Sequence, residues 1–114
     1  MKLSKVAIGR EAEHKAIHFL EAKGYIFVAS NYRYKRGEID LIMRDGEILV
    51  FVEVKSRKSD AYGFPEQWVS AKKLNLIQQT AEEYMIQCRW FGRIRFDIVA
   101  ISGDSGCCHL EDVS

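Results

Sequence analysis

The segment from Gly37 to Lys58, GEIDLIMRDGEILVFVEVKSRK, contains two apolar runs separated by Asp45-Gly46. Each run has the length and composition of a buried β-strand, and Asp-Gly is a frequent two-residue hairpin loop because it accepts positive φ angles. The segment therefore predicts an antiparallel hairpin with strands over residues 38–44 and 47–56. Charged side chains interrupt both strands, and a charge buried without a partner is costly. These charges need either a counter-ion or a function.

The predicted loop determines which residues of the two strands are paired, with Asp40 opposite Phe51 and Glu38 opposite Glu53. Side chains alternate along a strand, so four charged residues fall on one face, namely Glu38, Asp40, Glu53 and Lys55. Asp40 and Glu53 become diagonal neighbours with Cα atoms roughly 7–8 Å apart, which lets both carboxylates bind one Mg²⁺. Lys55 could then stabilise charge on a phosphate or help to activate water. The alternative is an exposed hairpin face with ordinary salt bridges.

The remaining segments predict helices at residues 4–23 and 65–84 and strands at 25–33 and 93–102, with CCHLEDV (107–113) as a weaker candidate for a last strand. Helical periodicity, Gly24 after the first helix and Pro65 at the start of the second support the helices. Aromatic and β-branched residues support the strands. The order α-β-β-β-α-β predicts one α/β domain over residues 1–114, with a mixed sheet flanked by helices.

Glu13 lies at helical spacing from the apolar residues of the first predicted helix. A carboxylate there either points at a buried partner or reaches solvent at the margin of the apolar stripe, and the spacing leaves both open. His14 and His18 form an i, i+4 pair that can bind metal, but no further residue completes a zinc site. We expect His109 at the surface. Asp97 is expected to pair with Arg93 or Arg95 rather than to bind metal.

Five stretches of the chain carry a family resemblance: EHKAIHFLEAKGY, NYRYKRGEIDLI, LVFVEVKSRK, YGFPEQWVSAKK and RFDIVAI. Together they resemble the YraN-like uncharacterised family of small bacterial proteins, placed in the PD-(D/E)xK nuclease superfamily with archaeal Holliday junction resolvases. The resemblance implies a restriction-endonuclease-like fold. It also implies a metal-dependent endonuclease site with Glu13, Asp40, Glu53 and Lys55 as catalytic residues. Glu13, Asp40 and Glu53 would be the metal ligands, with Mg²⁺ as cofactor and Mn²⁺ as its substitute. The family usually has Gly-Glu where this chain has Ala12-Glu13.

Basic residues gather around the charged hairpin and predict contacts with nucleic acid, namely Arg33, Lys35, Arg36, Arg57, Lys58, Lys72 and Lys73. Such residues neutralise phosphates. The whole chain carries 17 Lys and Arg against 16 Asp and Glu, so only this local cluster favours a nucleic-acid partner. The predicted function is Mg²⁺-dependent hydrolysis of DNA, with branched or single-stranded-containing DNA as the favoured substrate. The alternative is a non-catalytic nucleic-acid-binding or DNA-processing accessory protein that retains the fold. A homodimer would suit the two symmetric cuts of a four-way junction.

No apolar run approaches the roughly 18 residues of a membrane span, and the first residues contain no apolar segment typical of a secretory signal. Cys88, Cys107 and Cys108 lack the spacing of a disulfide framework or a zinc site. These features predict a cytoplasmic protein without a membrane partner. A redox role for Cys107-Cys108 is a remote alternative.

Overall fold

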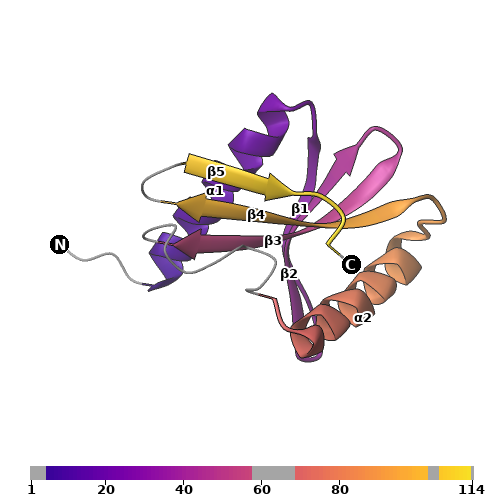
Figure 1. Ribbon diagram of the computed structural model, residues 1–114. Coiled ribbons are helices and arrows are strands. Elements are labelled where there is room, and N and C mark those ends of the chain that lie inside the picture. Colours follow the sequence, from indigo (N-terminus) through magenta and orange to yellow (C-terminus); the bar gives the residue numbers. More distant parts are fainter. Residues whose placement is uncertain (1–4, 58–68, 103–105, 114) are drawn as a thin grey trace.

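The computed structural model describes residues 5–57, 69–102 and 106–113 (Figure 1). The elements follow in the order α1 (Lys5–Ala22), β1 (Ile26–Tyr34), β2 (Gly37–Asp45), β3 (Ile48–Arg57), α2 (Ala71–Cys88), β4 (Ile94–Ser102) and β5 (Gly106–Leu110). The strands form one sheet in the order β1-β2-β3-β4-β5, with β3 and β4 parallel and the other neighbours antiparallel. The predicted mixed sheet flanked by helices is confirmed, and β5 confirms the weaker candidate strand.

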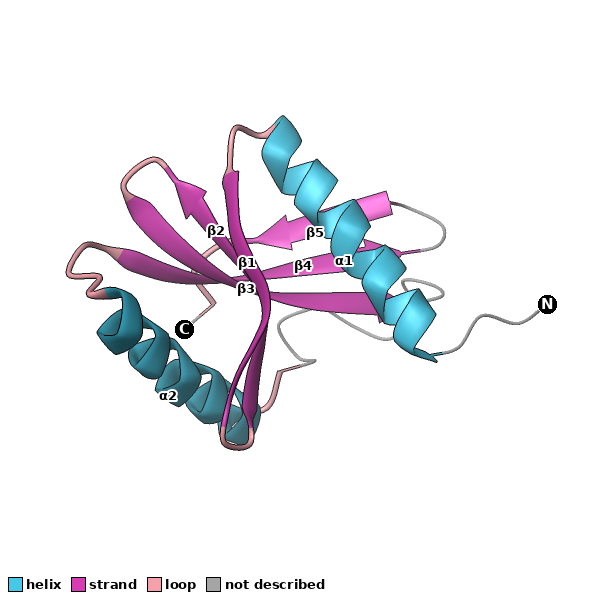
Figure 2. Ribbon diagram, turned by 180° about the vertical axis from the view of Figure 1, so that it is seen from behind, coloured by secondary structure: helices cyan, strands magenta, loops and turns pink. Residues whose placement is uncertain are grey.

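The helices cover opposite faces of the sheet, and the alternation along β3 divides the core between them (Figure 2). Val50 and Val52 face α1, whereas Leu49 and Phe51 face α2. All four side chains are buried, so β3 is covered on both faces, as a near-continuous apolar run requires. The helices contribute small and branched residues to these two layers: Ala12, Ala16 and Leu20 from α1, and Ile77 and Ala81 from α2.

The helix α2 begins at Ala71 rather than at the predicted Pro65, which lies outside the described residues. Ser70 is its N-cap, and the Ser70 hydroxyl accepts a hydrogen bond from the backbone N–H of Lys73 at 3.1 Å. A serine in this position satisfies one of the backbone donors that the first turn leaves unpaired. The N-cap therefore sets the start of α2 and the orientation of the residues in its first turn.

The loop between β2 and β3 is Gly46-Glu47, so the predicted Asp45-Gly46 loop is wrong. Asp45 pairs with Ile48, and Gly46 takes the first central position with a φ of 60°. Glycine adopts a positive φ without strain, and hairpin turns require one at this position. The pairing shifts by two residues, so Phe51 lies opposite Ile42 rather than Asp40. A shift of two preserves the faces of the paired side chains, because the alternation also has a period of two. The alternation itself breaks beside Asp40, since Ile39 and Ile42 both lie in the layer that faces α2.

The β2–β3 ladder ends at the pair Leu41–Val52, and beyond this pair the two central strands separate. The first residues of β2 stay paired with β1 as far as Gly37, while β3 continues along β4 as far as Arg57. Figure 2 shows the tip of the β1–β2 hairpin curving away from β3 to lie beside α2. We call this separation of β2 and β3 the fork.

Gly37 allows the hairpin to approach α2 closely. A β-carbon at this position would overlap the Thr80 hydroxyl and lie 2.8 Å from the backbone carbonyl oxygen of Leu76. Neither neighbour can yield easily, because one is helix backbone and the other is a buried side chain. Because Gly37 has no side chain, the β2 arm of the fork can lie directly against α2.

Candidate active site

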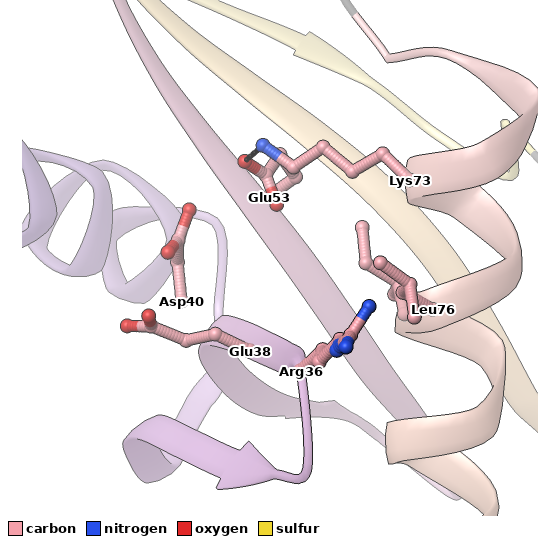
Figure 3. A pocket seen from close by; sticks show the side chains of 8 residues that line it. Arg36, Glu38, Asp40, Glu53, Lys73 and Leu76 are labelled. Carbon is pink, nitrogen blue, oxygen red and sulfur yellow. Dashed lines mark hydrogen bonds and ion pairs between the residues drawn. The ribbon is translucent and has the colours of Figure 1, made fainter.

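A pocket of about 330 Å³ opens at the fork. Figure 3 shows its principal side chains, which come from β2, β3 and α2. The lining residues are Arg36, Gly37, Glu38, Asp40, Glu53, Lys73, Leu76 and Ile77. Asp40 lies on β2 and Glu53 on β3, each next to the last pair of the ladder, with Asp40 just before Leu41 and Glu53 just after Val52. Two acidic side chains are thus brought to one pocket by strands that part from each other.

Asp40 is half-buried, and its Oδ2 atom accepts a hydrogen bond from the backbone N–H of Val54 at 2.8 Å. Burial and the neighbouring charge of Glu53 raise the pKa of Asp40 to about 7, and Glu13 and Glu38 add to this effect. The hydrogen bond from Val54 acts in the opposite direction but is outweighed. The ionised form of Asp40 is therefore disfavoured, and the pocket favours a proton or a cation beside it.

Glu53 is buried, with 8% of its side chain exposed, and two ammonium groups face its carboxylate. The Lys73 Nζ atom donates a hydrogen bond to the Glu53 Oε1 atom at 2.6 Å. The Lys55 Nζ atom lies 3.7 Å from the same oxygen. A buried carboxylate requires such partners, because an unpaired charge in this environment is strongly unfavourable. One oxygen of Glu53 is therefore shared by cations from β3 and α2.

Glu13 lies on α1, half-buried, and accepts a hydrogen bond from the Asn31 side-chain amide at 3.1 Å. It lines a separate hollow of about 320 Å³ rather than the pocket at the fork. The charge of Glu13 nevertheless raises the pKa of Asp40, so the two carboxylates influence each other electrostatically. Glu13 thus adds negative potential to the site from the α1 side.

Glu38 pairs with Arg33 of β1, and their side chains form an ion pair of 3.4 Å between Nε and Oε2. The predicted position of Glu38 opposite Glu53 is wrong because the ladder shifts and then ends before it. Glu38 still lines the pocket beside Asp40 (Figure 3). Its charge is compensated across the β1–β2 ladder.

Asp40 and Glu53 are the carboxylates of this pocket that could hold a metal ion. Within the described ranges of the chain, no three His, Cys, Asp or Glu side chains gather closely enough to hold one ion. Mg²⁺ does not require such a cage, since it commonly uses one or two carboxylates and retains several waters. Asp40 and Glu53 supply two carboxylates from opposite arms. Burial, followed by the charge of Glu53, raises the pKa of Asp40, and a cation would compensate the negative charge there. Glu13 does not join them in this arrangement.

The predicted nucleic-acid contacts lie at different distances from the pocket. Arg36 lines it, Lys35 is exposed in the β1–β2 loop, and the Arg33 side chain is 75% exposed beside Glu38. Lys72 is exposed on the first turn of α2, whereas Lys73 reaches into the pocket. The side chain of Arg57 and the whole of Lys58 lie outside the described residues.

Sequence reasoning missed Arg10 and Asn31, which line the hollow around Glu13 together with Gly9 and Arg33. The sequence could have indicated that Arg10 lies near Glu13, because a residue three positions before Glu13 lies on the same side of a helix. Asn31 gave no such signal. It belongs to β1 but has a φ of 55°, a conformation that asparagine tolerates better than most residues.

A second buried charged cluster is formed by Asp97, Arg95 and His109. Asp97 accepts hydrogen bonds from Arg95 Nε at 2.9 Å and from the Asp112 backbone N–H at 3.0 Å, and its Oδ2 atom lies 2.7 Å from His109 Nε2. Burial alone would raise the pKa of Asp97, but these hydrogen bonds and the charge of Arg95 lower it overall. The predicted pairing with arginine is confirmed. The prediction of His109 as a surface residue is wrong, since its side chain is 1% exposed.

Neither described helix combines the length and the apolar character needed to cross a membrane.

Fold and site together define a small α/β protein in which the central strands of a mixed sheet separate around a carboxylate- and lysine-lined pocket. The chain belongs to the uncharacterised protein family UPF0102, whose family model matches residues 12–101. It is 50% identical over 106 residues to a UPF0102 protein of Cytophaga hutchinsonii, covering 93% of this chain and 94% of that protein. UPF0102 proteins of Dictyoglomus turgidum and Thermotoga petrophila are 45% and 42% identical over 96 and 104 residues. The comparisons confirm the predicted uncharacterised family.

Proposed function

We propose that this protein is a Mg²⁺-dependent nuclease that hydrolyses phosphodiester bonds in DNA, preferably in branched or single-stranded-containing DNA. The main support is the convergence of Asp40 and Glu53 on one pocket from the two arms of the fork, with Lys55 at 3.7 Å from Glu53. Asp40 on β2, with Glu53 and Lys55 two residues apart on β3, matches the nuclease pattern that the sequence resembles.

The four predicted catalytic residues would each have a distinct role in the reaction. Asp40 and Glu53 would hold the metal, and the hydrogen bond from Val54 keeps the Asp40 carboxylate turned toward the fork. Bound Mg²⁺ would supply Lewis acidity toward the phosphate and lower the pKa of the attacking water. The water oxygen would bond to phosphorus and lose a proton to solvent, while the P–O bond to the leaving oxygen breaks and that oxygen takes up a proton from solvent. Lys55 would stabilise the negative charge that develops on the phosphate. Glu13 would hold a second ion or orient a water.

The nucleic acid would be bound by cations on both sides of the pocket. Arg36 lies at the pocket wall, with Lys35 next to it in the β1–β2 loop. Lys72 is exposed on the first turn of α2, beside the pocket residue Lys73. Phosphates bound between the hairpin and α2 would pass over the two carboxylates. Arg57 and Lys58 are further proposed contacts, although the Arg57 side chain and Lys58 lie outside the described residues.

A cleavage panel tests the proposal. Duplex, single-stranded, flap and four-way-junction DNA would be incubated with Mg²⁺ or Mn²⁺ and with wild-type protein, Asp40→Asn or Glu47→Gln. Glu47 is exposed in the β2–β3 loop, so Glu47→Gln removes one negative charge away from the pocket. We expect cleavage by wild type and Glu47→Gln and loss of at least about a hundredfold in Asp40→Asn, comparable to the loss of a strong electrostatic contribution.

Equal cleavage by Asp40→Asn would point to a contaminating nuclease and contradict the proposal. Absence of cleavage by all three proteins, with DNA binding retained, would favour the non-catalytic accessory protein. A binding assay at two salt concentrations distinguishes this case from a protein with no affinity for DNA, because phosphate contacts make affinity salt-dependent.

A further inference from the structure

Lys73 is held against Glu53 by the first turn of α2. The Ser70 cap accepts a hydrogen bond from the Lys73 backbone N–H, and the Lys73 side chain extends from that turn to the Glu53 carboxylate (Figure 3). The Lys73 side chain is 40% exposed, whereas that of Glu53 is 8% exposed. The ammonium therefore reaches from the surface of the helix into a pocket whose carboxylate has little access to water.

The Lys73 ammonium occupies one oxygen of Glu53, a carboxylate that the proposed function assigns to the metal. Its distance of 2.6 Å from Glu53 Oε1 is that of a short, charge-assisted hydrogen bond, whereas Lys55 lies 3.7 Å from the same oxygen. An ammonium and a divalent cation on one carboxylate oxygen would repel each other. Of the two lysines, Lys73 is the more exposed, at 40% against 22%, and has the easier path to solvent.

We propose that Lys73 is a built-in counter-ion of Glu53 that a divalent metal displaces, and that the released ammonium then binds a phosphate of the nucleic acid at the pocket. The inference rests on the proposed nuclease function and deepens it. Before metal binds, Lys73 keeps the buried Glu53 compensated. After metal binds, the same positive charge becomes available to the substrate, so metal and nucleic acid should bind with positive coupling.

Removal of the Lys73 ammonium should change metal affinity and DNA affinity in opposite directions. Removing the Lys73 ammonium abolishes a competitor of the metal, so metal affinity should rise. The same change removes a phosphate contact, so DNA affinity in the presence of metal should fall. A lysine with only a structural role would not strengthen metal binding when it is removed.

Lys72 provides the matched comparison, because it is the preceding residue on the same turn and its side chain is exposed. Lys72→Met removes the same charge from the protein and should weaken DNA binding modestly without changing metal affinity. Lys73→Arg restores the positive charge and should return metal affinity toward that of wild type. Lys73→Gln serves as a second charge-removing variant should Lys73→Met fold poorly.

Calorimetric titration of the full chain with Mn²⁺, followed by DNA binding at fixed Mn²⁺, tests the inference. We expect Lys73→Met to bind Mn²⁺ about tenfold more tightly than wild type, as expected for loss of a competing charge-assisted hydrogen bond. Mn²⁺ binding that is unchanged or weaker in both Lys73→Met and Lys73→Gln would overturn the role of Lys73 and leave the proposed nuclease intact. Absence of Mn²⁺ binding in wild type and in every variant would overturn the metal-dependent function and this inference together.

Discussion

The Asp40 carboxylate accepts a hydrogen bond from the Val54 backbone N–H, 2.8 Å away, across the point where β2 and β3 separate. A side chain on one arm of the fork thereby bonds to the backbone of the other arm. The bond fixes one oxygen of Asp40 and leaves the other oxygen for the pocket. The same bond stabilises the ionised carboxylate, yet burial and Glu53 still raise its pKa to about 7. The relationship leads to the first two predictions.

Asp40→Asn is expected to raise the thermal stability of the metal-free protein at pH 8. The asparagine side-chain oxygen can still accept the hydrogen bond from Val54, but the variant carries no charge beside Glu53. We expect the melting temperature in EDTA to rise by about 5 °C, equivalent to roughly 1 kcal/mol for a domain of this size. A melting temperature below that of wild type would contradict the electrostatic origin of the raised pKa.

The stability difference between wild type and Asp40→Asn should depend on pH. The pKa of Asp40 is about 7 in the folded protein, against 3.8 for an unperturbed Asp. Between these values the folded state binds more protons than the unfolded state, so the contribution of Asp40 to stability decreases as pH rises. Urea unfolding in EDTA at pH 5.5 and pH 8 should show the advantage of Asp40→Asn growing with pH. Saturating Mg²⁺ at pH 8 should stabilise wild type and leave the variant unchanged.

Gly37→Ala is expected to destabilise the protein by about 2 kcal/mol, because the added methyl group overlaps Thr80 and the Leu76 backbone. Gly9→Ala is the matched control. Gly9 is an exposed glycine of α1 whose added β-carbon would meet no atom within 4 Å. Alanine there should stabilise the helix by about 0.5–1 kcal/mol. Urea unfolding measures both changes, and two substitutions of equal effect would exclude a close contact at Gly37.

Asp97→Asn is expected to cost about 3 kcal/mol of stability while leaving metal and DNA affinity unchanged. The Asp97 side chain is fully buried between Arg95 and His109, and removal of its charge leaves Arg95 without its principal partner. The folded-state pKa of Asp97 is lowered, so its contribution to stability is lost as pH falls toward the acidic range. Chemical unfolding and Mn²⁺ titration separate the two effects. Weaker Mn²⁺ binding in this variant would connect the buried cluster to the site.

Arg36→Ala should weaken DNA binding and reduce the slope of log affinity against log salt by about 1, as expected for the loss of one phosphate contact. Lys15→Ala is the control, because Lys15 is an exposed cation on α1 that pairs with Glu11. Its removal should leave the slope unchanged. Equal slopes for wild type and Arg36→Ala, measured by fluorescence anisotropy, would remove Arg36 from the proposed path of the nucleic acid.

Asp40 and Glu53 line one pocket, as their expected position on one face predicted, even though the predicted register was wrong. The error arose because Asp-Gly was assigned as the loop, whereas Gly46 takes the first central position and Glu47 the second. A slip by one residue would have reversed the faces, but the slip by two preserved them. Local patterning therefore predicted that the two carboxylates lie close together. It did not predict their partners across the ladder or the break in alternation that places Ile39 and Ile42 in one layer.

The fork itself could not be predicted from local patterns. It depends on the fit of Gly37 against Thr80, two residues that are distant along the chain and meet only after α2 packs on the sheet. The burial of His109 was missed for the same reason. Its partners, Asp97 and Lys23, lie 12 and 86 residues away, so nothing near His109 in the sequence indicates a buried position.

The fork has a mechanical consequence for the candidate site. Asp40 belongs to a strand that is held by β1 and α2, whereas Glu53 belongs to a strand that is held by β4. Beyond the pair Leu41–Val52 the two strands are joined by the hydrogen bond from Val54 to Asp40 and not by ladder pairs. The distance between the carboxylates therefore depends on how the neighbouring elements place each strand. Because α2 packs against β2 and its Lys73 side chain bonds to Glu53, a change in the position of this helix would alter the separation of the two carboxylates.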